Sequence, residues 1–156
     1  MKKTLIAYFS AGGVTAQVAQ HMAAATGADL FEIRPVQPYT KADLNWMDRN
    51  SRSTLEMKDR ACRPVMAAAP DVAPYEVILV GFPVWWYREP SIIDTFMESA
   101  DFTGKIVVPF CTSGGSGLGD SAENLQALAP GALVKKGKRF AASAGAEALK
   151  SWAEQF

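Results

Sequence analysis

The residues best suited to chemistry in this sequence form a glycine-rich stretch that follows an apolar run and precedes a predicted helix. Residues 112–119 read TSGGSGLG, directly after the apolar residues 106–111. Glycine permits positive φ angles and lets a flat ligand approach the main chain, where backbone N–H groups can donate hydrogen bonds. Because turn residues also dominate ordinary loops, this stretch alone is equally consistent with a plain strand-to-helix connection.

A run of aromatic residues gives the glycine-rich stretch a partner. Trp85, Trp86 and Tyr87 come directly after an apolar run that continues through Pro83 and Val84. Three consecutive aromatic side chains cannot all face one core, so we expect at least one to stack on a planar ligand. We expect Trp86 or Tyr87 to make that contact while a neighbouring side chain closes the adjacent core.

The turn after the first predicted strand is suited to a phosphate group. Ser10 and Thr15 flank Gly12, Gly13 and Val14, just where a helix is predicted to begin. Helix N-terminal N–H groups and the helix dipole attract anions, and we expect the Thr15 hydroxyl to reach the phosphate from an exposed turn. A Walker lysine and the GxGxxG pattern are both absent, which favours a small monophosphate over a nucleoside triphosphate or a dinucleotide. An ordinary turn capped by Ser10 is the alternative.

Alternating strand and helix patterns must position these segments. Apolar or alternating runs predict strands over residues 4–9, 29–33, 76–82, 105–111 and within 132–141. Helical spacing predicts helices over residues 14–26, from 90 onward, 120–128 and 144–155. Strands separated by helices favour a parallel sheet covered on both faces. Residues 46–63 are charge-rich and weakly periodic, and we expect a solvent-facing helix there that covers one side of the sheet.

The three loop segments should meet at one edge of this sheet. Residues 10–15, 83–89 and 112–119 each follow a predicted strand. Ligands of open parallel sheets bind outside the carboxyl ends of the strands, at the point where the strand order reverses. We therefore expect one composite site with a phosphate turn, an aromatic wall and a glycine-lined platform. Together these describe a flat, phosphorylated ligand.

Composition and charge narrow the class of protein. A length of 156 residues, 49% of them hydrophobic, predicts a single domain over residues 1–156. The formal net charge is 0, which gives no case for a nucleic acid or an anionic membrane as partner. No apolar run is long enough to span a membrane, and the N-terminus lacks a signal-peptide cleavage pattern. Cys62 and Cys111 are expected to be free thiols in a reducing, cytoplasmic compartment, and the single histidine, His21, makes a histidine-based metal site improbable.

At this point the chain resembles the flavodoxin-like proteins, in particular a short-chain branch with PxWW after the third strand and TSGGSG after the fourth. The resemblance spans nearly the whole chain and is most specific in residues 81–86 and 109–117. It implies an α/β fold with a doubly wound, five-stranded parallel sheet of order 2-1-3-4-5 and noncovalently bound FMN. The family's phosphate turn usually reads S-x-T-G-N-T, so Gly12 and Val14 replace a threonine and an asparagine here. Tyr87 and Arg88 stand where relatives often have glycine, and would cover the flavin or narrow access to it.

The resemblance also implies the cofactor-binding residues. They are Ser10, Gly12, Gly13, Val14, Thr15, Pro83, Val84, Trp85, Trp86, Tyr87, Thr112, Ser113, Gly114, Gly115, Ser116 and Gly117. No catalytic residue or metal ligand is expected. Cys111, Trp46 and Trp152 are expected to be packing residues rather than ligands.

Two classes of function remain open. The favoured one is an FMN-dependent redox protein, either an electron shuttle for a larger partner or a small oxidoreductase. The neutral charge weakens the shuttle, because flavodoxins of that kind are usually strongly acidic. The oxidoreductase would act on a small acceptor such as a quinone, with NAD(P)H as a transient donor and Tyr87 and Arg88 lining the pocket. The alternative is a flavodoxin-fold binding module without flavin redox activity.

Overall fold

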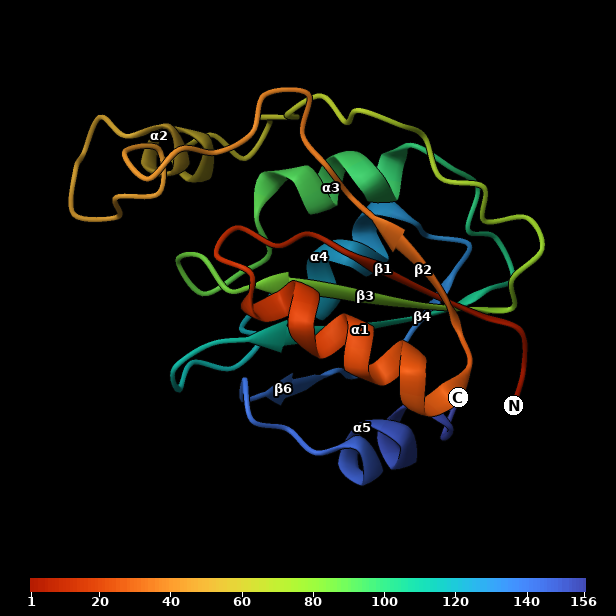
Figure 1. The fold of residues 1–156 in the computed structure, drawn as a ribbon. Helices are drawn as coiled ribbons and strands as arrows, with labels where there is room; N and C mark the ends of the chain where they lie inside the picture. Colours follow the sequence, from red (N-terminus) through yellow and green to blue (C-terminus); the bar gives the residue numbers. More distant parts are fainter.

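The central sheet of the computed structural model, which describes residues 1–156, is parallel throughout (Figure 1). Its strands lie in the order β2-β1-β3-β4-β5, and β6 also pairs with β4, which confirms the predicted order. The strands are β1 (Thr4–Tyr8), β2 (Asp29–Glu32), β3 (Val77–Pro83), β4 (Ile106–Thr112), β5 (Leu133–Val134) and β6 (Lys138–Phe140).

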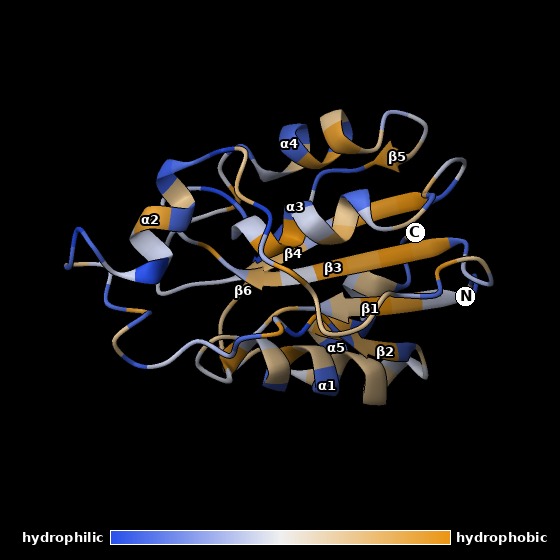
Figure 2. Ribbon diagram, turned by 90° about the horizontal axis from the view of Figure 1, so that it is seen from above, coloured by the Kyte–Doolittle hydropathy of each residue, from blue (hydrophilic) through white to orange (hydrophobic).

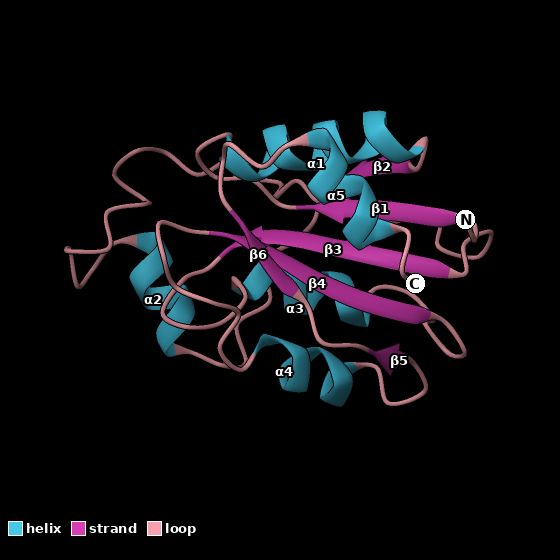
Figure 3. Ribbon diagram, turned by 90° about the horizontal axis from the view of Figure 1, so that it is seen from below, coloured by secondary structure: helices cyan, strands magenta, loops and turns pink.

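Helices cover both faces of the sheet, as predicted. The views from above and below show α1 and α5 on one face and α3 and α4 on the other (Figures 2 and 3). The helices are α1 (Val14–Thr26), α2 (Arg52–Lys58), α3 (Ser91–Glu98), α4 (Ser121–Leu128) and α5 (Ala146–Ala153).

Two hydrophobic cores, one on each face, hold these layers together. Ile78 and Val80 of β3 pack into the core beneath α3 and α4, whereas Leu79 packs into the core beneath α1 and α5. Each helix layer contributes a large aromatic residue to its core, Phe96 from α3 and Trp152 from α5. Because both faces of β3 are buried, its sequence is a nearly continuous apolar run, which is typical of a central parallel strand.

The predicted last strand is two short strands rather than one. Leu133 pairs with Ile106 at the start of β4, and Lys138 pairs with Phe110 near its end. Between them the chain passes so close to β4 that a Cβ added at Gly137 would overlap a backbone oxygen of β4. Three lysines, Lys135, Lys136 and Lys138, interrupt the apolar pattern of the predicted strand and lie along this edge.

The prediction of a solvent-facing helix over residues 46–63 is wrong in length and in burial. Residues 33–76 form one long excursion between β2 and β3, and α2 is its only α-helix. Ser51 caps α2 by accepting a hydrogen bond from the N–H of Thr54, while Ser53 and Met57 are buried against the rest of the chain. The excursion returns through antiparallel pairing of Pro35 with Met66. All three ribbon views place α2 beyond the carboxyl ends of the strands, opposite the two termini (Figures 1–3).

Candidate functional site

The three loops predicted to meet do line one cavity, of about 600 Å³, at the carboxyl edge of the sheet. We call it the loop cavity. Its lining comes from residues 11–15, residues 83–85, the end of β4 with the following loop, and two positions elsewhere. The lining residues are Ala11, Gly12, Val14, Thr15, Leu44, Pro83, Val84, Trp85, Thr112, Ser113, Gly114, Ser116 and Ala142.

The turn between β1 and α1 leaves hydrogen-bond donors free. Ser10 Oγ accepts hydrogen bonds from the N–H groups of Gly13 and Ala16, both at 3.1 Å. Gly13 has φ 95°, a left-handed angle that glycine adopts without strain, and no side chain caps the helix from this position. The N–H groups of Gly12 and Val14 donate to no protein atom. Free donors at a helix N-terminus favour an anion there.

Thr15 differs from the expectation of an exposed hydroxyl. Its side chain is buried, and its Oγ1 lies 2.7 Å from Oγ1 of Thr112. The pair therefore ties the first turn to the end of β4. Since one proton is shared between the two oxygens, the other hydroxyl proton stays available to a ligand in the loop cavity.

The glycine loop, residues 112–119, has open space beside three of its glycines, of which Gly114 lines the loop cavity. A Cβ added at Gly114, Gly115 or Gly117 would meet no atom within 4 Å. Packing within the chain therefore does not require glycine at these positions. An absent side chain there is instead suited to a flat molecule resting against the main chain.

One arginine holds this loop in place. Arg139 of β6 donates from Nε to Ser113 Oγ at 3.1 Å and from Nη2 to Ser113 O at 2.9 Å. Ser113 Oγ in turn donates to the carbonyl oxygen of Ser116. No other side chain outside the loop bonds to residues 113–117. Arg139 was not among the expected site residues, because its side-chain contact with Ser113 depends on the interruption of the last strand.

The aromatic turn, residues 85–88, divides its side chains between two directions. Trp85 packs edge-on against Phe9 at 5.6 Å and against Tyr39 at 5.4 Å, so it closes the core beneath the site. Trp86 and Tyr87 are exposed. They do not reach the loop cavity but line a second cavity of about 350 Å³ beside it. We call this second space the Trp46 cavity, after the residue that closes its other side.

The backbone of the aromatic turn is unusual. Trp85 and Arg88 exchange two backbone hydrogen bonds, at 3.1 and 3.2 Å, across the two residues between them. Trp86 has φ 47° and Tyr87 has φ 65°, both in the left-handed region. A two-residue turn with two positive φ angles normally carries Asn-Gly, because a Cβ is disfavoured there. A Cβ at Gly119 would overlap the Tyr87 carbonyl oxygen, so the glycine loop packs directly on this turn.

Arg88 is not in the pocket, contrary to the expectation. It is buried behind the aromatic turn, where Nη1 lies 3.4 Å from Asp94 Oδ2 and 3.7 Å from Glu89 Oε2. Its Nη2 donates to the carbonyl oxygen of Met57 in α2. The side chains of Tyr87 and Arg88 point in opposite directions: Tyr87 points toward solvent and Arg88 into the protein. The guanidinium therefore joins the turn to α2 and α3.

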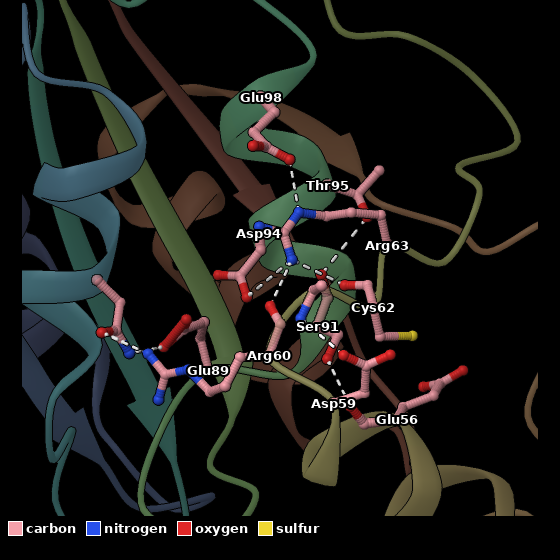
Figure 4. Close-up of polar contacts among 12 residues, drawn as sticks. Glu56, Asp59, Arg60, Cys62, Arg63, Glu89, Ser91, Asp94, Thr95 and Glu98 are labelled. Atoms are coloured by element: carbon pink, nitrogen blue, oxygen red, sulfur yellow. Dashed lines mark hydrogen bonds and ion pairs between the residues drawn. The ribbon is translucent and has the colours of Figure 1, made fainter.

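Two buried carboxyl groups complete this polar cluster (Figure 4). Glu89 Oε1 accepts a hydrogen bond from Asn124 of α4, while Oε2 of Glu89 and Oδ1 of Asp94 have no hydrogen-bond partner. Burial, reinforced by Asp94, raises the pKa of Glu89 to about 8. Arg63 approaches Asp94 from the solvent side and also pairs with Glu98 (Figure 4). The cluster fixes the base of the aromatic turn without facing either cavity.

The remaining expected ligands divide into those beside the loop cavity and those away from it. Ser10 lines a neighbouring cavity near Tyr39, and Gly13 forms the helix cap. Gly117 lines a larger cavity of about 1120 Å³ between α4 and the β5–β6 edge, and Gly115 lines none of these spaces. The sequence analysis missed Ala11, Leu44 and Ala142 of the loop cavity. Small and aliphatic residues in irregular segments carry no chemical signal of their own.

Other expectations concern single residues. Burial raises the pKa of the Cys111 thiol to about 11, consistent with a packing role. Trp152 is a core residue as expected, but Trp46 is exposed rather than packed. No group of three or more metal-binding side chains is present. No helix is long and apolar enough to cross a membrane.

Comparison with known proteins decides the family. The family model described as flavodoxin matches residues 3–156. The chain belongs to the flavodoxin family. No curated protein matches the chain.

Solved structures extend this flavodoxin assignment. The chain is 44% identical to a protein from Bacteroides uniformis provisionally described as a flavoprotein, with a TM-score of 0.91 and 99% of each chain covered. A protein from Bacteroides eggerthii with the same provisional description is 42% identical, with a TM-score of 0.92, 99% of this chain covered and 97% of that one. A flavoprotein from Lactobacillus acidophilus, solved in complex with FMN, shares 23% identity and has a TM-score of 0.72 over 89% of this chain and 93% of that one. The flavodoxin-like fold and the family predicted from the sequence are therefore confirmed.

Proposed function

We propose that this chain binds FMN in the loop cavity and transfers electrons or hydride to a small-molecule acceptor. The observation that carries the proposal is that free backbone donors at the start of α1, the start of the glycine loop and Trp85 all line one cavity. FMN is the cofactor of the flavodoxin family, and a structure of one relative holds it. A cavity of about 600 Å³ lies within the usual range for small-molecule and cofactor sites, roughly 300–1,000 Å³.

Each part of the site has its own task toward FMN. The N–H groups of Gly12 and Val14, with Ser10 and the Thr15–Thr112 pair, would hold the phosphate. The glycine loop would receive the flat ring system against its main chain, and Trp85 would close the core beneath it. FMN supplies the redox chemistry, while the chain orients it and limits water access.

A small-molecule acceptor is favoured over a protein partner by the shape and charge of the surroundings. The Trp46 cavity lies directly beside the loop cavity, with shared walls at Leu44, Val84, Trp85 and Ser116. The chain has a net charge of 0, so it lacks the acidic surface that steers a shuttle to a basic partner. NAD(P)H remains the candidate donor. Free Cys62 and Cys111 fit a reducing compartment, which supports a cytoplasmic location.

Titration with FMN and with riboflavin tests the proposal. The two ligands share one ring system, so their difference in affinity measures the phosphate turn alone. We expect FMN to bind at least ~10-fold more tightly, since hydrogen bonds to a charged group contribute roughly 1.5–3 kcal/mol. Equal affinities would show that the turn between β1 and α1 does not bind the phosphate. Absence of binding by either ligand would favour the alternative, a flavodoxin-fold module without a flavin.

A further inference from the structure

The Trp46 cavity is lined by neutral residues from three separate segments. Leu44, Trp46 and Ser53 come from the excursion, residues 84–87 from the aromatic turn, and Ser116 from the glycine loop. The polar side-chain groups of the lining residues are the hydroxyls of the two serines and of Tyr87 and the indole N–H groups of the tryptophans, all of them neutral. No lysine, arginine, aspartate or glutamate reaches the lining. Such a wall cannot compensate the charge of a phosphate or a carboxylate.

The aromatic side chains around this space are left exposed by the fold. Trp46 is 71% exposed, Tyr87 76% and Trp86 42%, although each could have been buried in a chain of this size. Exposed apolar groups that gather around a hollow mark a binding site more often than a solvated surface. Aromatic rings also bind flat molecules with little loss of side-chain entropy, because each has only two rotatable bonds.

The backbone holds two of these rings outward at an energetic cost. Trp86 and Tyr87 both adopt left-handed φ angles, which a bulky side chain rarely does. The strained turn is kept in place by the reciprocal Trp85–Arg88 hydrogen bonds and by the contact with Gly119. Backbone strain of this kind persists where the neighbouring structure imposes it, typically at ligand sites.

The excursion completes the site from the opposite side. It is far longer than the roughly 12–15 residues beyond which irregular connections are usually functional. Tyr39 anchors it to Trp85, and its hydroxyl donates to Glu56 of α2 at 2.5 Å, while Arg52 stacks on the Tyr39 ring at 3.8 Å. This anchoring holds the excursion next to the segment from which Leu44 and Trp46 line the cavity.

We propose that the Trp46 cavity binds an uncharged, planar aromatic molecule of about two fused rings as the second substrate. This inference rests on the proposed function, because the shared walls would bring such a molecule against FMN in the loop cavity. A volume of about 350 Å³ is at the small end for ligand sites, and the lining lacks a cation for a pyrophosphate. A nicotinamide dinucleotide therefore does not fit this space, whereas a quinone does.

FMN held by the loop cavity would supply the redox chemistry: once reduced by the proposed donor NAD(P)H, it would give a hydride equivalent to a quinone in the Trp46 cavity. A second proton would come from water, so that the quinone would leave as a hydroquinone. The protein's own contribution would be to hold the two molecules next to each other.

Calorimetric titration with two probes tests the inference on both FMN-free and FMN-loaded protein. Dimethylnaphthoquinone is uncharged and has no free position on its quinone ring for addition of the Cys62 thiol. The 6-sulfonate of 2,3-dimethyl-1,4-naphthoquinone has the same fused rings and carries a negative charge. We expect the quinone to bind at least ~10-fold more tightly than the sulfonate, because the lining offers no partner for a charge. Equal binding of the two probes would overturn the inference.

Trp46→Ala and Met47→Ala form a matched pair of variants. Both side chains are more than two-thirds exposed and adjacent in sequence, but only Trp46 lines the cavity. Trp46→Ala should weaken quinone binding roughly tenfold through loss of ring stacking and apolar contact, whereas Met47→Ala should leave it unchanged. Thermal melting of both variants checks that each folds. Equal effects of the two substitutions, or none from Trp46→Ala, would contradict the assignment.

The same experiments separate this inference from the proposed function. FMN binding without quinone binding would overturn the inference and leave the proposed function standing. Quinone binding without FMN binding would overturn the proposed function and the role of the quinone as second substrate, and would leave the Trp46 cavity as a ligand site only. Light scattering measures self-association as a last test. If the protein binds no quinone but forms a dimer that Trp46→Ala dissociates, these rings pack against a second copy of the chain and the inference is wrong.

Discussion

The aromatic turn and the glycine loop form two walls of the same site, but they are held in opposite ways. The aromatic turn is fixed from behind by a buried polar cluster around Arg88 and is strained at Trp86 and Tyr87. The glycine loop has open space beside it, and its central residues 113–117 bond to only one side chain from outside the loop, that of Arg139. A wall of the first kind is rigid, whereas the second can adapt to the molecule that binds. We therefore expect substitutions behind the aromatic turn to lower the stability of the fold, and substitutions behind the glycine loop to weaken ligand binding.

Removing Arg88 should have the largest effect. Arg88→Met leaves the buried carboxylate of Asp94 short of its nearest cation and frees the carbonyl of Met57. We expect the free energy of unfolding to fall by about 3–5 kcal/mol, the usual cost of breaking a buried ion pair from one side. Urea denaturation measures it.

Arg63 provides the control for Arg88. It also approaches Asp94, at 3.9 Å, but its side chain is 30% exposed, and its partner Glu98 is more exposed still. Arg63→Met should cost only about 0–1 kcal/mol, because exposed ion pairs contribute little. Similar losses for the two substitutions would mean that burial does not distinguish the two arginines and that the aromatic turn is not fixed by this cluster.

The pH dependence of stability gives the next effect. Glu89 has a pKa of about 8 in the folded chain, above its unfolded value, so between these values the folded chain holds a proton that the unfolded chain has lost. Stability should therefore fall as pH rises from about 5 to 8, by up to about 1.4 kcal/mol per unit, and then level off. Glu89→Gln should flatten this slope in urea denaturation followed at several pH values. An unchanged slope in that variant would assign the dependence to another group.

Breaking the Arg139 clamp should act on the other wall. Arg139→Met removes two hydrogen bonds to Ser113 and should leave the glycine loop less ordered. Because hydrogen bonds to a charged group contribute roughly 1.5–3 kcal/mol, we expect the dissociation constant of FMN to rise ~10-fold or more. Arg139→Lys keeps the charge but cannot reproduce the two-pronged contact. Full recovery of affinity in the lysine variant would show that charge rather than loop position matters. Amide hydrogen exchange of residues 113–117 without FMN gives an independent measure of loop order.

Relieving the turn strain should have the smallest effect, of opposite sign. Tyr87→Gly removes a Cβ from a left-handed residue, and we expect a gain of about 1 kcal/mol in stability. Tyr87→Ala removes the ring, which is 76% exposed, but keeps the Cβ, and should gain nothing. The difference between these two melting curves measures the strain. If the Tyr87→Ala variant is as stable as the Tyr87→Gly variant, the aromatic turn is not strained, and backbone strain does not distinguish it from the glycine loop.

The sequence predicted much of the fold because strong local patterns coincide with the elements. The apolar run of β3, the spacing of α1 and the alternation of strands with helices led to a parallel sheet covered on both faces, whereas the strand order came from the resemblance to the flavodoxin-like proteins. The convergence of three loops followed from the parallel sheet, since the carboxyl ends of its strands share one edge. These features depend on periodicity and topology, which a sequence displays directly.

The parts that were missed depend on tertiary contacts. Arg88 and Tyr87 are adjacent, and nothing in their sequence indicates which one the turn directs inward. Arg139 meets Ser113 only because the last strand is interrupted before it. Leu44 and Trp46 reach the site from an irregular excursion whose path is set by Tyr39 and Trp85. Each of these contacts joins residues far apart in the chain, so no local pattern contains it.

The interrupted outer strand also affects how copies of this chain behave toward one another. A long, flat outer strand offers a row of unpaired backbone groups to which a second chain can add. Here the outer row is broken between β5 and β6, and the break carries exposed Lys135 and Lys136, with Lys138 just beyond it. A second copy would have to bring its own lysines against these at short range. The division of the last strand thus protects the concentrated protein against strand addition and aggregation along this side.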